Sequence, residues 1–398
     1  MTRIPFARPW MDEREAGAAR RAILSGWVTQ GPEVLAFERE LAGAVGAPHA
    51  CAVSSCTTAL HMALLAVGVG PGDDVVTASH SFVATANSIR YCGARPVFVD
   101  VEPGTFNIDP SRVEAAITPR TRALLVVHQV GMPCDLKALL ASARARGLPV
   151  IEDAACAIGS EIDWDGGWEP IGRPRGDIAC FSFHPRKLVS TGDGGMLTTR
   201  SAEYDATFRL LRHHGMSVPD TVRHASAQVI AETYPIVGFN YRLTDIQAAV
   251  GREQLTRLPA IVARRREMGA RYQALLADLP GIILPIEPAW ARTNWQTYTI
   301  RLAEGLDQGA VMQQMLDAGI STRRGVMNAH REASHPKGSW SCGPAHDTCT
   351  CAGSGCEWLR TGETLQDTAI ALPLFHQMTE GDQDRVVAAL RAACAQPA

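Results

Sequence analysis

The hydrophobic positions of the first 250 residues follow two alternating spacings. Val34, Phe37, Leu41 and Val45 recur at helical spacing, and Gly46 is placed to end that helix. Between such helices lie short apolar runs rich in β-branched residues, which predict strands buried on both faces. These runs cover residues 50–53, 75–78, 97–101, 123–127, 150–151 and 178–183. The pattern predicts an α/β domain whose mostly parallel sheet is flanked by helices.

The pattern changes after Thr244. Thr244-Asp245-Ile246-Gln247 predicts a capping box at the start of a long helix that continues through residue 276. A smaller unit follows, with one strand-like run at 296–302 and helices near 310–318 and 382–394. Residues 331–360 are rich in Gly, Pro, Ser and Cys and predict a long loop. We therefore expect a large domain over residues 1–255 and a small α+β domain over residues 256–398.

The amino-acid composition and charge exclude several classes of protein. Hydrophobic residues make up 46% of the 398 residues and charged residues 20%, which is typical of a globular chain and not of a disordered one. The net charge of −3, without a block of like charge, argues against a nucleic-acid-binding face. No apolar run reaches the roughly 20 residues of a membrane span, and the first residues lack a signal-peptide pattern. Eleven cysteines lie mostly in apolar segments, as in reduced cytoplasmic proteins. We expect a cytoplasmic enzyme.

Three segments carry candidate chemistry, each directly after a predicted strand. Ligands of α/β sheets bind outside the carboxyl ends of the strands. Lys187 follows one strand and precedes a glycine-rich stretch at 192–195, so it could form a Schiff base, or it could be a surface lysine on a loop. Asp153 follows another strand, where a cationic partner such as a protonated pyridine nitrogen would offset its burial; a helix N-cap is the alternative. The run Ser54-Ser55-Cys56-Thr57-Thr58 could bind phosphate at a helix N-terminus or could simply cap the helix.

Together these segments resemble the DegT/DnrJ/StrS family of pyridoxal-phosphate-dependent nucleotide-sugar aminotransferases, within the fold-type-I aspartate aminotransferase superfamily. The resemblance runs from about Gly26 to Phe375, nearly the whole chain. It implies a fold-type-I α/β architecture and pyridoxal 5′-phosphate as the cofactor. Its landmarks are Phe82-Val83-Ala84-Thr85-Ala86-Asn87, Val127-His128-Gln129-Val130-Gly131, Glu152-Asp153-Ala154-Ala155, Phe181-Ser182-Phe183-His184 with Lys187, and Gly238-Phe239-Asn240-Tyr241-Arg242.

The resemblance assigns roles to individual positions. It implies that Lys187 forms the Schiff base and moves the proton, and that Asp153 pairs with the pyridine nitrogen. It also implies that Phe82 covers the cofactor ring, although a phenylalanine taken alone is more often a core residue. Asn240 would reach the cofactor of a neighbouring subunit, which implies a homodimer with shared active sites. The residues matched to phosphate binding are Thr57, Thr58 and Ser182.

Two positions depart from the family pattern. Cys156 occupies a position near the cofactor's phenolic oxygen where glutamine or histidine is usual, and a thiol is a weak donor. Cys56 stands where glycine is common and could crowd the phosphate turn.

Arg323, Arg324 and His330 fall where the family brings residues towards its substrate, and a guanidinium suits phosphate or carboxylate; a solvated arginine pair is the alternative.

The cysteine-rich loop contains enough potential ligands for a metal site. Cys342, Cys349, Cys351 and Cys356, with His346 nearby, could supply a tetrahedral zinc site. Their spacing lacks the paired C-x-x-C pattern, so we assign no metal. Free thiols in a family-specific loop, or a disulfide, are the alternatives.

The sequence therefore predicts an aminotransferase that moves an amino group from an amino acid, expected to be glutamate, to a keto-sugar linked to a nucleotide. Other carbanion chemistry on the same cofactor, such as dehydration or transamination of a cyclitol or natural-product intermediate, is the second hypothesis. The lysine argues against dehydration, because the sugar dehydratases of the family carry histidine in its place. A non-catalytic relative is a third hypothesis, and the presence of both Lys187 and Asp153 argues against it.

Overall fold

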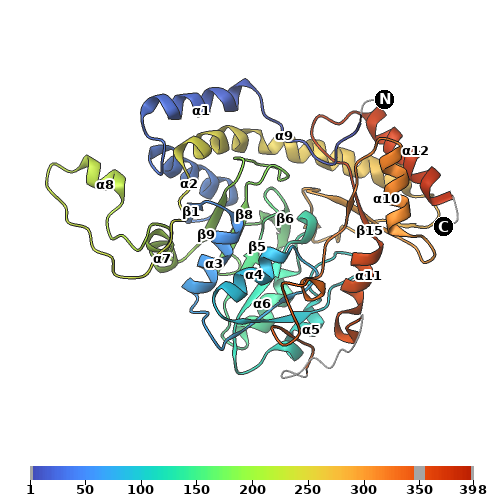
Figure 1. Ribbon diagram of the computed structural model, residues 1–398, viewed down its shortest axis with the longest axis horizontal. Helices are drawn as coiled ribbons and strands as arrows, with labels where there is room; N and C mark the ends of the chain where they lie inside the picture. The colour runs from blue at the N-terminus through green and yellow to red at the C-terminus, as the bar shows by residue number, and fades with distance from the viewer. Residues whose placement is uncertain (1–2, 345–354, 396–398) are drawn as a thin grey trace.

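The computed structural model describes residues 3–344 and 355–395. A sheet with the strand order β1-β9-β8-β5-β4-β2-β3-β14 lies at its centre (Figure 1). Neighbours from β8 to β14 pair in parallel, while β1, β9 and β8 pair antiparallel, so the prediction of a mostly parallel sheet is confirmed. The strands are β1 His49–Val53, β2 Asp74–Ala78, β3 Arg95–Val99, β4 Thr121–Val127, β5 Val150–Asp153, β8 Ile178–Ser182, β9 Gly195–Thr199 and β14 Ser341–Cys342.

Helices cover both faces of this sheet. Consecutive strand residues face opposite sides, and both sides are apolar. Leu124 belongs to a core cluster that includes residues of α2, α5, α6 and α9, whereas Leu125 belongs to one that includes residues of α3, α4 and α7. This explains why the strands appear in the sequence as continuous apolar runs rather than alternating ones. The helices are α1 Glu13–Ser25, α2 Pro32–Val45, α3 Cys56–Ala66, α4 Val83–Tyr91, α5 Pro110–Ala116, α6 Leu136–Arg144, α7 Ala202–Arg212 and α9 Asp245–Leu276.

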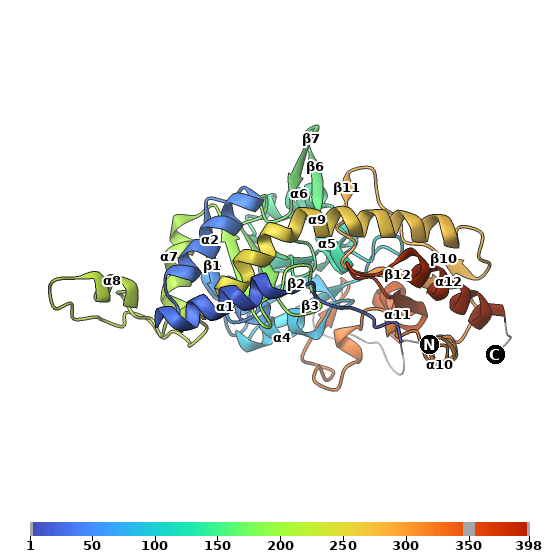
Figure 2. The same cartoon turned by 90° about the horizontal axis from the view of Figure 1, so that it is seen from above.

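A smaller unit packs beside the large sheet. Its antiparallel sheet has the order β10-β12-β15-β13, and α10 and α12 cover it (Figure 1). A third, three-stranded sheet, β11-β6-β7, projects from the body beside α9 (Figure 2). The elements are β6 Glu161–Trp164, β7 Gly167–Pro170, β10 Ile282–Ile283, β11 Ala291–Arg292, β12 Tyr298–Leu302, α10 Gln308–Asp317, β13 Arg323–Arg324, α11 Arg360–Thr368, β15 Ala369–Leu372 and α12 Glu380–Ala395.

Helix α9 runs along both units (Figure 2). Its predicted capping box is confirmed: Thr244 Oγ1 accepts from the amide of Gln247 at 3.2 Å. Its first half packs into the core of the large sheet up to Val262, and from Met268 onwards it packs into the core of the small sheet. The division at residue 255 stays a prediction. None of the described helices is long and apolar enough to cross a membrane.

The segment from residue 216 to residue 237, which contains α8 Asp220–Ala225, extends away from the rest of the molecule (Figures 1 and 2). Apolar side chains along it are exposed to solvent rather than packed. They are Val222, Val229, Tyr234, Ile236 and Val237.

The prediction of a long loop over residues 331–360 is wrong in part. Ser341 and Cys342 form β14, which pairs in parallel with β3, and Glu357–Leu359 forms a short 3-10 helix. Trp340, Cys342 and Cys356 pack in one cluster with Phe98 of β3. The sequence could not show this, because the pairing depends on a strand far earlier in the chain. Residues 345–354 lie outside the described part.

A buried ion pair ties β1 to the helices beside it. Glu38 on α2 is 3% exposed, accepts from the amide of Ala52 at 2.9 Å and pairs with Arg212 on α7. Arg209 also donates to Glu38, at 3.1 Å. Burial opposes ionisation, but the two guanidinium groups hold the pKa of Glu38 below its usual value. The pair therefore stabilises the edge of the sheet next to the start of α3.

We expect Glu38→Ala to lower the free energy of unfolding by about 3–5 kcal/mol, because it leaves the Arg212 charge buried without its partner. Urea unfolding followed by circular dichroism measures the loss. Glu40→Ala is the matched control, since Glu40 is exposed and bonds Arg252 at the surface, where a pair contributes about 0–1 kcal/mol. Equal stability of the two variants would contradict this account.

Candidate active site

A cavity of about 700 Å³ lies where the carboxyl ends of the parallel strands meet the small unit. It gathers most of the residues that the sequence singled out, although they come from segments far apart in the chain. Of the predicted residues, Thr57, Phe82, Asp153, Cys156, Ser182, Lys187, Arg323 and Arg324 line it.

Lys187 reaches the cavity from the turn that follows β8. Its Nζ donates to the sulfur of Cys156 at 2.9 Å, so the position with an unusual thiol touches the lysine amine directly. Burial acts to lower the pKa of Lys187, but its contact with Cys156 and the charge of Asp153 raise it, and the net direction is upward. The amine is thus held at a defined place in the wall of the cavity.

Asp153 is the last residue of β5 and is 6% exposed. Burial raises the pKa of this carboxyl group, while hydrogen bonds from Thr85 Oγ1 at 2.8 Å and the amide of Ala155 at 3.2 Å lower it in part. The net effect is a raised pKa, so the hydrogen bonds from the protein do not fully compensate the ionised carboxylate for its burial. A cation in the cavity would stabilise it.

The preceding residue, Glu152, points away from the cavity. It accepts from His128 Nε2 at 2.9 Å and from the amide of Gly176 at 2.9 Å. The amide of Cys134 donates to the other ring nitrogen of His128, which fixes the ring beneath the site. Because consecutive strand residues face opposite sides of the sheet, Asp153 faces the cavity, whereas Glu152 faces away from it and holds His128 in place.

The N-terminus of α3 borders the cavity. Ser55 caps the helix and accepts from the amide of Thr58 at 3.1 Å, and the Thr58 hydroxyl donates to the carbonyl oxygen of Ser55 at 2.7 Å. Thr58 is thus engaged in the cap, whereas Thr57 lines the cavity. Gly195 allows this arrangement, because a Cβ there would lie 2.4 Å from the carbonyl carbon of Ser55.

Cys56, the second departure from the family pattern, follows this cap. Its sulfur lies 3.6 Å from the carbonyl oxygen of Cys180 on β8. Burial raises the pKa of this thiol well above its usual value, so it stays protonated. The thiol is therefore a neutral group held against the sheet.

An aromatic side chain and a strained turn both line the cavity. Phe82, just before α4, is 58% exposed, which is unusual for a phenylalanine and fits a surface that covers a ligand. Val130, after β4, has a φ of 53°, a conformation that is costly for a β-branched residue. Such strain persists only where the surroundings enforce it, and it clusters at functional sites.

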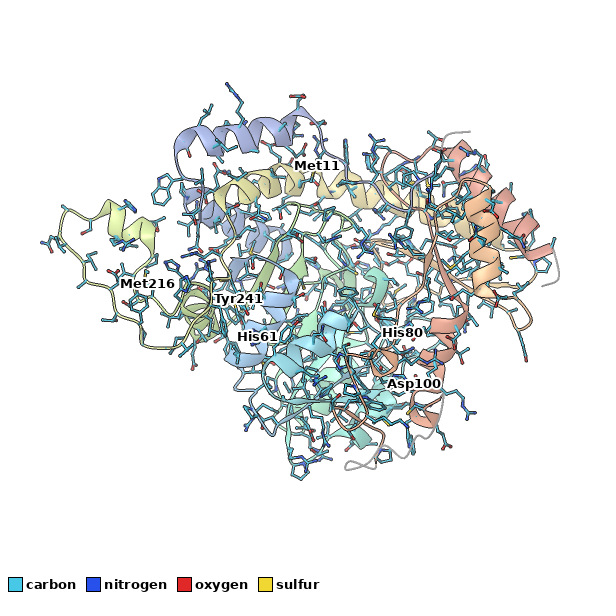
Figure 3. The ribbon with its side chains drawn as sticks, in the orientation of Figure 1. Met11, His61, His80, Asp100, Met216 and Tyr241 are labelled. Carbon is cyan, nitrogen blue, oxygen red and sulfur yellow. The ribbon has the colours of Figure 1, made fainter. Side chains whose placement is uncertain are left out.

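Two predicted residues lie away from the cavity. Asn240 is exposed near α7, in a bridge with His213, and Figure 3 marks its neighbour Tyr241 on that side of the molecule. The side chain of His330 is only 5% exposed, because it bonds Ser79 Oγ at 2.6 Å and Glu363 at 2.9 Å. The proposed substrate contact of His330 and the proposed cofactor contact of Asn240 stay predictions.

The cysteine-rich loop is described only in part. The sulfur atoms of Cys342 and Cys356 lie 3.4 Å apart. Cys349, Cys351 and His346 lie outside the described residues. Within the described residues no group of three or more potential ligands is arranged to hold a metal ion.

The structure also adds residues to the cavity that the sequence did not single out, and three of them bear on the site. Thr85 holds Asp153, Arg186 precedes the lysine, and Phe6 reaches the cavity from the N-terminal segment. Thr85 lies inside a family landmark and could have been found from it. Phe6 could not, because its position depends on the packing of the N-terminal segment against Leu374 of the small unit.

We expect Asp153→Asn to stabilise the ligand-free protein, and the gain to grow with pH. Because the folded pKa of Asp153 is raised, its ionisation costs stability as the pH rises above the unfolded value, and the cost is absent when both states are protonated. Urea unfolding between about pH 4 and pH 8 measures the difference from wild type. Asp165→Asn, at an exposed carboxylate, is the control. A gain that is independent of pH would contradict the prediction.

Comparison with known proteins agrees with this geometry. Residues 9–391 match the model of the DegT/DnrJ/EryC1/StrS aminotransferase family. The spore coat polysaccharide biosynthesis protein SpsC of Bacillus subtilis (strain 168) is 41% identical over 315 residues, which are 79% of this chain and 79% of that protein. The aminotransferase TlmJ from Streptoalloteichus hindustanus superposes with a TM-score of 0.86, at 32% identity over 99% of both chains. The structure of 3-amino-5-hydroxybenzoic acid synthase superposes with a TM-score of 0.85, at 29% identity over 98% of both chains.

The family match covers nearly the whole chain, and the predicted fold-type-I architecture and enzyme class are both confirmed. This chain belongs to the DegT/DnrJ/EryC1/StrS aminotransferase family, whose members depend on pyridoxal phosphate.

Proposed function

We propose that the protein uses pyridoxal 5′-phosphate to move an amino group from glutamate to a nucleotide-linked keto-sugar. The observation that carries this proposal is that one cavity contains both the Lys187 amine and the buried carboxylate of Asp153. An amine that can bind an aldehyde and a carboxylate that lacks a cation are the two groups that a pyridoxal ring requires.

The remaining walls fit the same cofactor. Bound pyridoxal phosphate supplies an aldehyde carbon and a protonated ring that withdraws electrons. Asp153 would hold the proton on the ring nitrogen, and Phe82 would cover one face of the ring. The first amides of α3, the Thr57 hydroxyl and Ser182 would bind the phosphate, since a helix N-terminus favours anions.

Lys187 would act as the proton carrier in both half-reactions. Its amine lies in the cavity wall. Once the amino group of the substrate has taken the place of this amine on the cofactor, the amine would be free to move a proton. Cys156, which contacts the amine at 2.9 Å, would keep it close to the reacting carbon. The side chains of this chain therefore provide the base, its orientation and the charge partner of the ring.

The acceptor assignment rests on family relationship and on charge. SpsC is named for polysaccharide biosynthesis, which favours a sugar acceptor for this chain. Arg323 and Arg324 are exposed on β13 and line the cavity, where guanidinium groups can bind phosphate or carboxylate. Glutamate is the donor that we expect.

We also propose a homodimer with shared active sites. The segment with α8 projects from the body and exposes apolar side chains, as expected of a surface that a second copy covers (Figure 1). Asn240 follows this segment and lies outside the cavity of its own chain. An isologous dimer could bring it to the partner's cavity, and symmetry would complete both sites at once.

A second candidate is transamination of a natural-product intermediate that is not a sugar. The 29% identity with 3-amino-5-hydroxybenzoic acid synthase over nearly the whole chain favours keeping it. Both candidates use the same lysine and aspartate and differ only in the acceptor.

The proposed activity is tested by incubating the loaded enzyme with glutamate and a panel of nucleotide-linked keto-sugars, and measuring the release of 2-oxoglutarate. We expect release that depends on one of the acceptors. Lys187→Ala should lose this activity while keeping the fold, because the role of the lysine is chemical. Release with aromatic or cyclitol ketones alone would favour the second candidate instead.

The covalent link can be located directly, since the sequence has three lysines, Lys137, Lys187 and Lys337. Borohydride reduction followed by peptide mass spectrometry should place the pyridoxyl group on Lys187. Lys137→Ala is the control, as Lys137 is exposed and pairs with Asp165. A pyridoxyl group on another amine of the wild-type protein would show that the reactive lysine is misassigned.

Sharing of the sites predicts complementation between inactive variants. When Lys187→Ala and Asn240→Ala protomers are mixed and allowed to exchange, each heterodimer should contain one site with both native residues. We expect a partial return of activity, measured as 2-oxoglutarate release. No return despite subunit exchange proven by mass spectrometry would exclude sharing through Asn240.

A further inference from the structure

A second cavity, of about 730 Å³, lies at the edge of the large sheet opposite to the candidate active site. Its lining includes Arg122 near the start of β4, Pro149 just before β5 and Asp177 just before β8. Asp153 and Lys187, in contrast, lie at or beyond the carboxyl ends of β5 and β8. No described residue lines both cavities. A ligand in the second cavity would therefore bind apart from the reacting groups.

The second cavity is strongly basic, although the whole chain has a net charge of −3. The described residues that line it include one carboxylate, Asp177, which accepts from the amide of Val150 at 2.8 Å and so holds the start of β5. They also include five arginines from four separate segments, which are Arg122, Arg144, Arg146, Arg175 and Arg200. A local excess of one sign in a cleft concentrates ligands of the opposite sign.

The partners of these arginines account for only part of the cluster. Three of the five pair with carboxylates outside the lining, which are Asp73, Glu114 and Glu169. Among the residues that the structure describes, no carboxylate forms an ion pair with Arg144 or Arg200, and both side chains are exposed. Arg144 lies in the last turn of α6, where the helix dipole favours a cation, but Arg200 follows β9 and has no such reason for its place. These two guanidinium groups can bind an anion from solution.

The rest of the lining is largely apolar. Val67, Leu140, Leu148 and Pro149 contribute to it, together with Tyr204 of α7. Burial and two nearby carboxylates raise the pKa of the Tyr204 hydroxyl, so this group keeps its proton and can donate a hydrogen bond. The volume falls within the range of about 300–1,000 Å³ that is usual for sites of small molecules. Such a lining suits a small molecule that carries phosphate groups on an organic part.

We propose that the second cavity is a binding site for a nucleoside polyphosphate, separate from the candidate active site. The phosphates would bind the guanidinium groups, above all those of Arg144 and Arg200, and the nucleoside would contact the apolar lining and Tyr204. Several linked phosphates fit better than one, because the arginines come from four segments around the cavity. A nucleic acid fits less well, because the positive charge is confined to one cavity of an acidic chain.

The test is equilibrium binding to the cofactor-loaded enzyme by calorimetry. The probes are adenosine triphosphate and uridine triphosphate, with inorganic triphosphate and the two nucleosides as their separate parts. We expect each nucleotide to bind more tightly than either of its parts. The double variant Arg144→Ala/Arg200→Ala should weaken nucleotide binding by about ten- to a hundredfold, because hydrogen bonds to charged groups are lost. Arg144→Lys/Arg200→Lys should recover part of the affinity, since lysine keeps the charge but lacks the planar fork.

Arg20→Ala/Arg39→Ala is the matched control. It removes the same charge from exposed positions on α1 and α2 that lie outside both cavities. Its affinity for the nucleotides should equal that of wild type. All four positions are exposed, so the variants should keep the fold, and the absorbance of the bound cofactor checks this.

Chemical modification locates the site directly. Phenylglyoxal reacts with exposed arginines, and peptide mass spectrometry identifies those that a bound nucleotide protects. We expect protection of Arg144 and Arg200 but not of Arg39. Protection of Arg186 or Arg323 without that of Arg144 and Arg200 would place the nucleotide in the candidate active site and overturn the proposal.

Four binding results would also overturn it. The first two are that wild type binds neither nucleotide, or that Arg144→Ala/Arg200→Ala binds both as wild type does. The third is that inorganic triphosphate binds as tightly as the nucleotides, because the apolar lining would then contribute nothing to recognition. The fourth is that a short single-stranded RNA binds more tightly than the nucleotides, because this face would then serve a nucleic acid.

Discussion

The buried carboxylate of Asp153 is the constraint on which the rest of the site depends. It ends β5, is 6% exposed, and has a raised pKa because burial outweighs its hydrogen bonds. Burying a charge without full compensation is costly, so the fold holds this residue at the expense of stability. A protonated ring nitrogen would remove that cost. The structure is thus arranged to be completed by a cationic ligand.

The order of the strands decides which groups surround this carboxylate. β5 pairs in parallel with β8 through Asp153 and Cys180, so the two strands end at the same edge and the chain continues from β8 towards Lys187. On the other side of β8, the antiparallel pair of β1 and β9 holds the start of α3 against Gly195. The amine, the carboxylate and the helix N-terminus meet because of this order.

The small unit supplies part of the cavity wall, but it contains neither the lysine nor the aspartate described above. It contributes Gln296, which fixes the backbone of Arg186, and it carries Arg323 and Arg324 on its edge strand. The groups that fit the cofactor, by contrast, all belong to the large sheet and its connections.

The sequence by itself determined the features that depend on local physics. Helix α2 ends at Gly46 and α9 begins at a capping box because near neighbours in the chain set those boundaries, and both were predicted correctly. The buried strands were visible as apolar runs. Lys187 and Asp153 could be named because each follows such a run, at the edge where ligands bind.

The tertiary structure decided everything that depends on distant segments. The pairing of β14 with β3 and the burial of His330 against Ser79 and Glu363 have no signature in the local pattern. Arg186 is one more arginine in the sequence, and only the fold brings it to the cavity. Local hydrogen bonds and periodicity fix the elements, whereas the packing of the two units fixes which side chains face the ligand.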